Sequence, residues 1–200
     1  MELKLKECPK NPTIIEGFPG VGLIGTITTE YLIKHLKAKA IGFIKSEEIA
    51  PIAAVHEGKV VQPLELYYVK SKNLIIVHSL VDVRGIEWEI AEALTEVYKK
   101  LKAKEIISIE GIMSQDVTSI KTYYFANKTI QAKKFANSSA KPLKEGILMG
   151  VTAALLLHSK DIITTGVFVE THTKLPDSMA SARIIEILDI YLNLGVDYKP

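Results

Sequence analysis

The chain has 200 residues, of which 48% are hydrophobic and 24% charged, and its formal net charge at pH 7 is +2. A chain of this length and apolar content can bury a full hydrophobic core, so we expect one domain that covers residues 1–200. No apolar run approaches the roughly 20 residues that a membrane span needs. The first ten residues, MELKLKECPK, contain no hydrophobic signal region, which predicts a cytoplasmic protein.

The polar composition argues against two classes of site. The 25 basic residues include only two arginines, Arg84 and Arg183. Lysine lacks the rigid fork with which arginine contacts phosphate groups, so a nucleic-acid partner is not expected. A single cysteine, Cys8, rules out an internal disulfide and a cysteine metal site. The five histidines have no metal-ligand spacing, and we expect neither a metal nor another cofactor.

Strand and helix patterns alternate along most of the chain. Near-continuous apolar runs are typical of strands buried on both faces of a parallel sheet, and apolar stripes at helical spacing predict helices. In chain order, the pattern predicts a strand at 13–18, a helix at 21–37, strands at 40–45 and 73–79, a helix at 86–102, a strand at 105–111, a helix at 145–158, a strand at 163–171 and a helix at 177–193.

Two regions depart from this alternation. Between residues 53 and 79, a Gly-Lys turn at 58–59 and a second turn at 71–73 predict antiparallel hairpins. Within residues 114–142, TYYFANKT favours a strand, whereas FANSSAKP is typical of a loop. Alternating strands and helices around a hairpin region predict a single-domain three-layer α/β/α sandwich with a mixed central sheet. Irregular structure is expected at 46–52 and 112–122.

A glycine-rich turn follows the first strong strand. Residues 17–22 are G-F-P-G-V-G, and the six residues from Gly20 formally match the dinucleotide fingerprint G-x-G-x-x-G. Pro19 stiffens this turn, and the chain continues into hairpins rather than a second βαβ unit, which disfavours a bound dinucleotide. Two interpretations are left: an anion site made of backbone N–H groups, or a corner where Gly20 and Gly22 let the first strand and helix meet closely. We favour the corner.

Three predicted strands end on a carboxylate, namely Glu16, Glu110 and Glu170. If these strands are parallel, the three side chains converge with His172 outside the carboxyl ends of the sheet, where open α/β sheets bind ligands. Converging carboxylates can bind a cation or raise one another's pKa for acid–base chemistry. Alternatively, each accepts backbone N–H bonds and holds a loop, and this is the interpretation we favour. The candidate crevice consists of Glu16, Gly17, Pro19, Gly20, Gly22, Glu110, Gly111 and Glu170.

The last predicted helix supplies a candidate partner surface. Besides its core stripe it carries further apolar residues, more than one sheet face should cover, which predicts a homo-oligomer formed through this helix or the adjoining hairpins. The candidate partner-binding residues are Met179, Ile184, Ile187 and Tyr191. The chain has no G-x-S-x-G elbow, so we assign no catalytic residue and expect a non-enzymatic protein.

The stretch IIEGFPGVGLIGTITTEYLI closely resembles the signature of the proteasome assembly chaperone 2 family, in its archaeal branch. Further segments agree with the family in order: IIVHSLVDV, IISIEGI, EGILMGVTAALLL, VFVETH and PDSMASARIIEILDIYLNLGVDY. The resemblance therefore covers nearly the whole chain, from Thr13 to Tyr198. Its most specific parts are the G-F-P-G-V-G turn and the last helix with its Leu-Gly-Val-Asp ending.

The resemblance implies an α/β fold similar to that of nucleoside phosphorylases, without a known reaction, and a role in protein assembly. Eukaryotic relatives help proteasome α subunits to form rings. The expected partners are therefore further copies of the chain and proteasome subunits or another assembly factor, without nucleic acid or membrane. The alternative function is an enzyme or a small-ligand binder, for phosphate or a nucleotide, that uses the candidate crevice.

The chain end resembles a docking motif that is displaced by one position. Proteasome activators and several assembly chaperones end in a hydrophobic residue, a tyrosine and one further residue, which dock between α subunits. Here Tyr198 is third from the end, and Asp197 replaces the hydrophobic residue at a desolvation cost in an apolar pocket. We therefore expect a short tail that does not dock.

Overall fold

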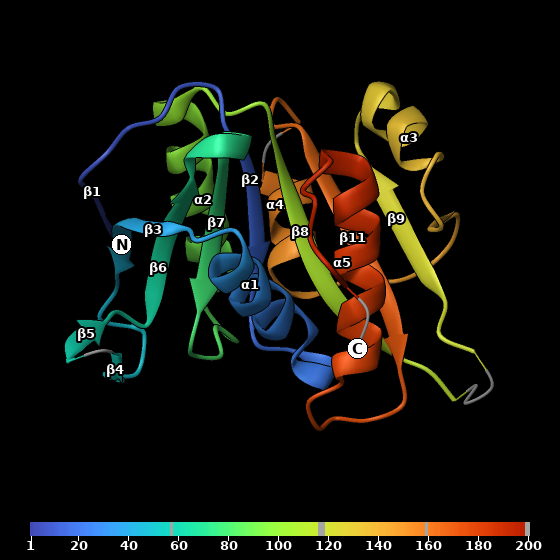
Figure 1. The fold of residues 1–200 in the computed structure, drawn as a ribbon, viewed down its shortest axis with the longest axis horizontal. Helices are drawn as coiled ribbons and strands as arrows, with labels where there is room; N and C mark the ends of the chain where they lie inside the picture. Colours follow the sequence, from blue (N-terminus) through green and yellow to red (C-terminus); the bar gives the residue numbers. More distant parts are fainter. Residues whose placement is uncertain (57, 116–118, 159, 199–200) are drawn as a thin grey trace.

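The computed structural model describes residues 1–56, 58–115, 119–158 and 160–198, and its centre is a nine-stranded mixed sheet (Figure 1). Its strands are β1 (Glu2–Leu5), β2 (Thr13–Gly17), β3 (Lys39–Lys45), β6 (Leu64–Val69), β7 (Leu74–Ser79), β8 (Glu105–Met113), β9 (Thr122–Ala126), β10 (Lys141–Pro142) and β11 (Thr164–Thr171). They lie in the order β1-β3-β6-β7-β2-β8-β11-β9-β10. The central four, β7, β2, β8 and β11, run parallel, as their continuous apolar runs predicted.

The predicted hairpins are confirmed. β4 (Ala54–His56) and β5 (Lys59–Val61) pair antiparallel and form a separate two-stranded sheet. β6 and β7 pair antiparallel across the short 3-10 helix η2 (Lys70–Lys72). Neither helix nor strand occupies residues 46–53, and β8 and β9 enclose an irregular segment of which residues 116–118 lie outside the described ranges.

Helices cover both faces of the sheet and give the predicted three layers (Figure 1). A 3-10 turn, η1 (Val21–Leu23), leads into α1 (Ile24–His35), which packs beside α5 (Ser178–Leu192) on one face. α2 (Glu87–Leu101) and α4 (Gly150–His158) pack together on the other face. Neighbouring residues of β2 point to opposite faces, so Ile14 enters one apolar cluster and Ile15 the other. Within the described ranges, no helix is long and apolar enough to cross a bilayer.

Two boundaries differ from the sequence-based prediction. The predicted helix at 145–158 begins only at Gly150, which has φ +73°, and the preceding residues 143–149 form no helix. A short helix, α3 (Thr129–Phe135), occupies residues where a strand end and a loop were expected. Its last residue, Phe135, is fully buried and stacks on the rings of Tyr124 and Tyr191, with ring centroids 5.5 and 3.9 Å apart. A tertiary contact therefore fixes this helix, and local periodicity does not reveal it.

Two of the four partner-binding residues predicted on the last helix lie in the core. Ile184 and Ile187 are completely buried, because α5 packs against α1 as well as against the sheet. Tyr191 packs on Phe135 of α3, and its hydroxyl donates to Glu105 Oε2 at 2.8 Å. Of the four predicted residues, Met179 is the exposed one, with 55% of its surface accessible, and Tyr191 is half-buried.

Substitutions on α5 should separate core from surface. We expect Ile187→Ala to lower the free energy of unfolding by about 2–5 kcal/mol, because it leaves a cavity in the core. The matched surface change Met179→Ala should cost less than about 0.5 kcal/mol. Urea denaturation measures both values. An Ile187→Ala chain with unchanged stability would show that this side chain is not part of the core.

Candidate functional site

The three strand-end carboxylates share one face of the sheet. β2, β8 and β11 are adjacent and parallel, with Glu16 level with Ser108 and Glu110 level with Phe168. Residues level with one another or two apart on a strand point to the same face, so all three carboxylates lie on the side covered by α2 and α4. Glu170 lies further along its strand and accepts a hydrogen bond from the Tyr123 hydroxyl at 3.1 Å. Glu16 and Glu110 are therefore the pair that can interact.

Glu110 caps the first turn of α4. Its Oε1 accepts a hydrogen bond from the Thr152 hydroxyl at 2.7 Å and from the Thr152 backbone N–H at 3.3 Å. A carboxylate at this position satisfies an otherwise unpaired donor and complements the helix dipole. Burial raises the pKa of Glu110, while the two bonds from Thr152 lower it. Gly150 approaches the same oxygen so closely that a Cβ atom there would lie 3.1 Å from it.

Glu16 is a buried acid next to this cap. Its side chain is 1% exposed, and its Oε1 has no hydrogen-bond partner among the described residues. Burial raises the pKa of Glu16 to about 8, against a lowering effect of its hydrogen bond with Ser108 and with a smaller raising effect of Glu110. Ser108 also hydrogen-bonds the Thr152 hydroxyl, which links the two acids. At neutral pH, Glu16 is therefore mainly protonated and neutral.

The glycine-rich turn lies against the opposite face and is filled by its own helix. A Cβ atom on Gly17 would lie 2.7 Å from the carbonyl carbon of Gly25 in α1, and one on Gly25 would lie 2.7 Å from the carbonyl oxygen of Phe18. A Cβ atom on Gly111 would likewise overlap the Val21 carbonyl oxygen. The close approach that we predicted therefore exists. It is made by Gly17, Gly25 and Gly111 rather than by the two glycines at positions 20 and 22.

The other residues of the turn have different environments. Gly20 is exposed, and only the Phe18 carbonyl oxygen comes within 4.0 Å of its Cβ position. Gly22 adopts φ +68° and faces Thr171, and its carbonyl oxygen accepts from the Asp177 N–H at 2.9 Å. Pro19 is half-buried. The Asp177 loop thus places a carboxylate beside the turn, which disfavours an anion there.

Among the described residues, the predicted crevice residues lie against two different faces of the sheet. Glu16 and Glu110 lie under α4, whereas Gly17 and Gly111 lie under α1 and η1. Two surface hollows, of 340 and 370 Å³, contain none of the predicted crevice residues. Among the described residues, no group of three or more His, Cys, Asp or Glu side chains could hold a metal ion. His172 is half-buried, with Nδ1 3.3 Å from the Ser114 carbonyl oxygen.

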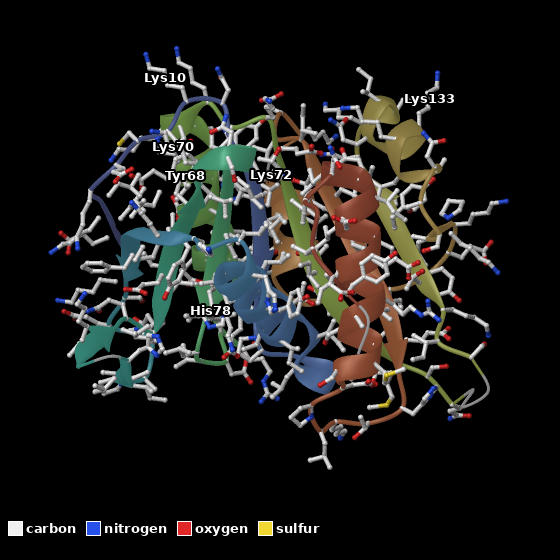
Figure 2. The ribbon with its side chains drawn as sticks, viewed as in Figure 1. Lys10, Tyr68, Lys70, Lys72, His78 and Lys133 are labelled. Atoms are coloured by element: carbon white, nitrogen blue, oxygen red, sulfur yellow. The ribbon has the colours of Figure 1, made fainter. Side chains whose placement is uncertain are left out.

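Sequence reasoning assigned no role to His78 of β7 (Figure 2). Its side chain contacts α1 and holds this helix against the sheet. Its Nδ1 lies 2.8 Å from Thr29 Oγ1, and the Thr29 hydroxyl donates to the Gly25 carbonyl at 2.8 Å. Since that hydroxyl proton is used, Nδ1 carries the ring proton and donates to Thr29. Burial lowers the pKa of His78, which keeps it neutral, although Glu30 has a smaller raising effect. In the sequence, the one sign of this contact is a histidine in a strand that is predicted to be buried, together with a threonine in the preceding helix.

The contact between β2 and α1 predicts unequal effects of two glycine substitutions. Gly17→Ala should lower the free energy of unfolding by about 1–3 kcal/mol, because the new methyl group must push the backbone of α1 away from the sheet. Gly20→Ala is the matched control and should change it by less than about 0.5 kcal/mol. Chemical denaturation measures both. Equal effects would contradict the close packing at Gly17.

The buried acid predicts a pH dependence of stability with a defined sign. The pKa of Glu16 is about 8 in the folded chain and near 4.5 when unfolded. Its contribution to stability is therefore complete below pH 4.5, falls as the pH rises, and levels off above about pH 8. Each pKa unit corresponds to about 1.4 kcal/mol, so the loss amounts to a few kcal/mol. Glu16→Gln should match the wild type at low pH and exceed it at pH 9.

The control for this experiment is Glu92→Gln on the exposed face of α2. Free energies of unfolding should be measured by urea denaturation from pH 4 to pH 9. The control should follow the wild-type curve throughout. Parallel curves for wild type and Glu16→Gln would show that the folded chain already ionises Glu16 at ordinary pH.

Comparison with known proteins relates the chain to one family over nearly its full length. The model of the PAC2 family matches residues 14–200. An uncharacterized Methanocaldococcus jannaschii protein, MJ0106, is 28% identical over 193 residues, which are 95% of this chain and 79% of the relative.

Solved structures of two Pyrococcus furiosus proteins are also similar. PbaA, described as an archaeal homolog of proteasome-assembly chaperone, has a TM-score of 0.91 and 28% identity over 99% of this chain and 84% of its own. PbaB, described as an archaeal proteasome activator, has a TM-score of 0.85 at 23% identity over 98% of this chain and 91% of its own, and shows the shared fold alone. Together with the family match, these similarities confirm the predicted resemblance: the chain belongs to the PAC2 family.

Proposed function

We propose that the chain is a non-enzymatic protein-assembly factor of the proteasome assembly chaperone type, which acts through its protein surfaces as a homo-oligomer. The observation that carries this proposal is the similarity to PbaA, with a TM-score of 0.91 over 99% of the chain. Proteasome subunits or another assembly factor are the proposed partners, and the cytoplasm is the proposed location. The chain works as a single assembly-chaperone-like domain built on its one continuous nine-stranded sheet.

The geometry of the strand ends supports a binding role over a catalytic one. A general acid or base must reach its substrate within hydrogen-bond distance. Glu16 is buried and Glu110 is used as a helix cap, so neither is presented to a ligand. In the glycine-rich turn, Gly17 packs against the backbone of α1, which supports a structural role for that residue. Binding through the outer surface requires none of these groups.

One observation favours a small-ligand site as the alternative. Glu16 Oε1 is buried without a partner, and its raised pKa is of the kind that active sites use. The predicted likeness to nucleoside phosphorylases concerns the fold and stays a prediction. A nucleotide or phosphorylated metabolite that raises the melting temperature of the wild type, but not that of Glu16→Gln, would favour it.

The proposed function predicts direct binding to proteasome components. The purified, tagged chain should retain cognate proteasome α subunits or 20S particles in a pull-down at micromolar concentration. The same tag on an unrelated protein of similar charge is the control. Absence of binding to both separate α subunits and assembled particles would contradict a proteasome-directed role.

The C-terminal tail should be dispensable for that binding. Tyr198 packs against the apolar cluster between α1 and α5, and the Tyr31 hydroxyl donates to the Asp197 carbonyl. Lys199 and Pro200 lie outside the described residues. Deleting residues 198–200 should therefore leave the amount of retained proteasome within about twofold of wild type, equivalent to under about 0.5 kcal/mol. Loss of 20S binding in this truncated chain would show that the tail docks.

A further inference from the structure

Exposed lysines gather on the edge of the sheet where its four parallel strands begin. The connections into β2, β7, β8 and β11 lie there, together with α3 and the residues before it and the end of α5 (Figure 1). We call these segments the basic edge, and they are residues 6–12, 70–73, 98–105, 127–135, 160–163 and 189–193.

The basic edge separates charge within the molecule. It contains 12 of the 25 basic residues and 4 of the 23 acidic ones, so its net charge is +8. The rest of the chain, with 13 basic and 19 acidic residues, has a net charge of −6. All 12 basic residues are lysines with exposed side chains, and Figure 2 labels Lys10, Lys70, Lys72 and Lys133 among them. The small net charge of the whole chain is therefore the balance of two oppositely charged regions.

Neighbouring groups neutralise only part of this positive charge. The ion pairs between described residues lie elsewhere on the chain. Lys72 and Lys128 donate instead to backbone carbonyl oxygens, those of Asn193 at 2.5 Å and of Lys160 at 3.0 Å. Four of the lysines complement helix dipoles in the last turns of α2 and α3, and the other eight lie outside these helices. Because like charges repel, such an edge favours an anionic partner.

An exposed apolar side chain lies among these lysines. Ile130 in α3 is 67% exposed, and Lys133 and Lys134 follow it at the spacing that places residues on the same side of a helix. Ile190, at the end of α5, is 48% exposed. An apolar residue surrounded by polar ones is typical of a protein–protein contact. The edge therefore suits a polypeptide that carries both carboxylates and an apolar side chain.

The same edge lacks the features of a nucleic-acid site. Arg84 and Arg183, which could contact phosphate groups with a rigid fork, both lie outside it. Its aromatic rings are not free for bases to stack on, since Tyr98 and Tyr191 are half-buried and Phe135 is fully buried. The two hollows of 340 and 370 Å³ contain none of its residues, so neither offers these lysines to a small anion.

We propose that the basic edge is a docking surface for an acidic segment of a partner protein. Carboxylates of the segment pair with the lysines, and one of its apolar side chains packs on Ile130. The net charge of +8 attracts such a segment and steers its approach. The inference rests on the protein-binding role in the proposed function and names the chemistry of the partner's surface.

The test measures binding of a fluorescently labelled peptide with the repeat Glu-Glu-Leu by fluorescence anisotropy at low salt. A triple variant, Lys10→Gln with Lys70→Gln and Lys133→Gln, should weaken binding about tenfold, because each lost pair is worth a few tenths of a kcal/mol or more. Circular dichroism melts check that the variant is folded. With the unchanged chain, about 1 M salt should release the peptide, because the Debye length falls to about 3 Å.

The matched control removes the same number of charges outside the basic edge. It combines changes at three exposed lysines, Lys45→Gln, Lys59→Gln and Lys174→Gln. Both triple variants have the same net charge, so a general attraction between the peptide and a positive protein would affect them equally. The control should bind the peptide within about twofold of wild type, because its edge is intact.

A second pair of variants tests the apolar contact. Ile130→Ser should weaken binding of the Glu-Glu-Leu peptide at least about threefold and leave binding of poly-L-glutamate unchanged, because only the first peptide has an apolar side chain to bury. Ile147→Ser is the matched control, since Ile147 is 88% exposed and lies outside the edge. It should bind both peptides as the wild type does.

Three results would overturn the proposal: no binding of the peptide at low salt, equal losses in the two triple variants, or a labelled DNA duplex that binds the edge more tightly than the peptide. The last result would assign the edge to nucleic acid. These measurements are independent of the proteasome pull-down. A chain that retains 20S particles but fails them would keep the assembly role and lose the basic edge as its docking surface. A chain that passes them without retaining proteasome subunits would keep the acidic partner and lose the proteasome.

Discussion

The backbone contact between Gly17 in β2 and Gly25 in α1 sets how closely α1 packs on its face of the sheet. With no side chain on either residue, the first turn of α1 lies directly on the end of β2. This close approach of the helix to the sheet brings Thr29 within hydrogen-bond distance of His78 on β7, and the Thr29 hydroxyl donates to the Gly25 carbonyl. A larger residue at either glycine would move the helix and break this link. At Gly17 and Gly25 the strand-end turn therefore serves to pack the first helix onto the sheet.

On the other face of the sheet, polar contacts rather than glycine packing hold the start of α4 at the strand ends. Glu110 holds the first turn of α4 through Thr152, and Ser108 connects the Thr152 hydroxyl to Glu16. A neutral Glu16 avoids the cost of a buried charge, which is why burial next to a second acid is tolerated. The carboxyl ends of the parallel strands, where open α/β sheets commonly bind ligands, are thus occupied on both faces by the chain's own helices.

Sequence patterns predicted the central architecture because the information there is local. Continuous apolar runs identified the four parallel strands, and the Gly-Lys turn identified the β4–β5 hairpin. Elements fixed by distant contacts were missed. Phe135 ends α3 by stacking on Tyr191, 56 positions later in the chain, and no periodicity encodes that contact. The predicted crevice combined Glu16 with Gly17, although adjacent strand residues point to opposite faces, because the sequence does not show that a different helix covers each face at the strand ends.

The contrast between closely packed core contacts and exposed connections explains where partner specificity can reside. The sheet and its two helix layers depend on close contacts such as Gly17 with Gly25, which few substitutions satisfy. Residues 46–53 and 143–149 form neither helix nor strand and expose apolar side chains such as Ile52 and Ile147. Surface substitutions there cost little stability, so these two connections can change in sequence without disturbing the sheet. With Met179 on α5, they are exposed apolar segments through which the chain can contact a partner while the sheet and its helix layers stay unchanged.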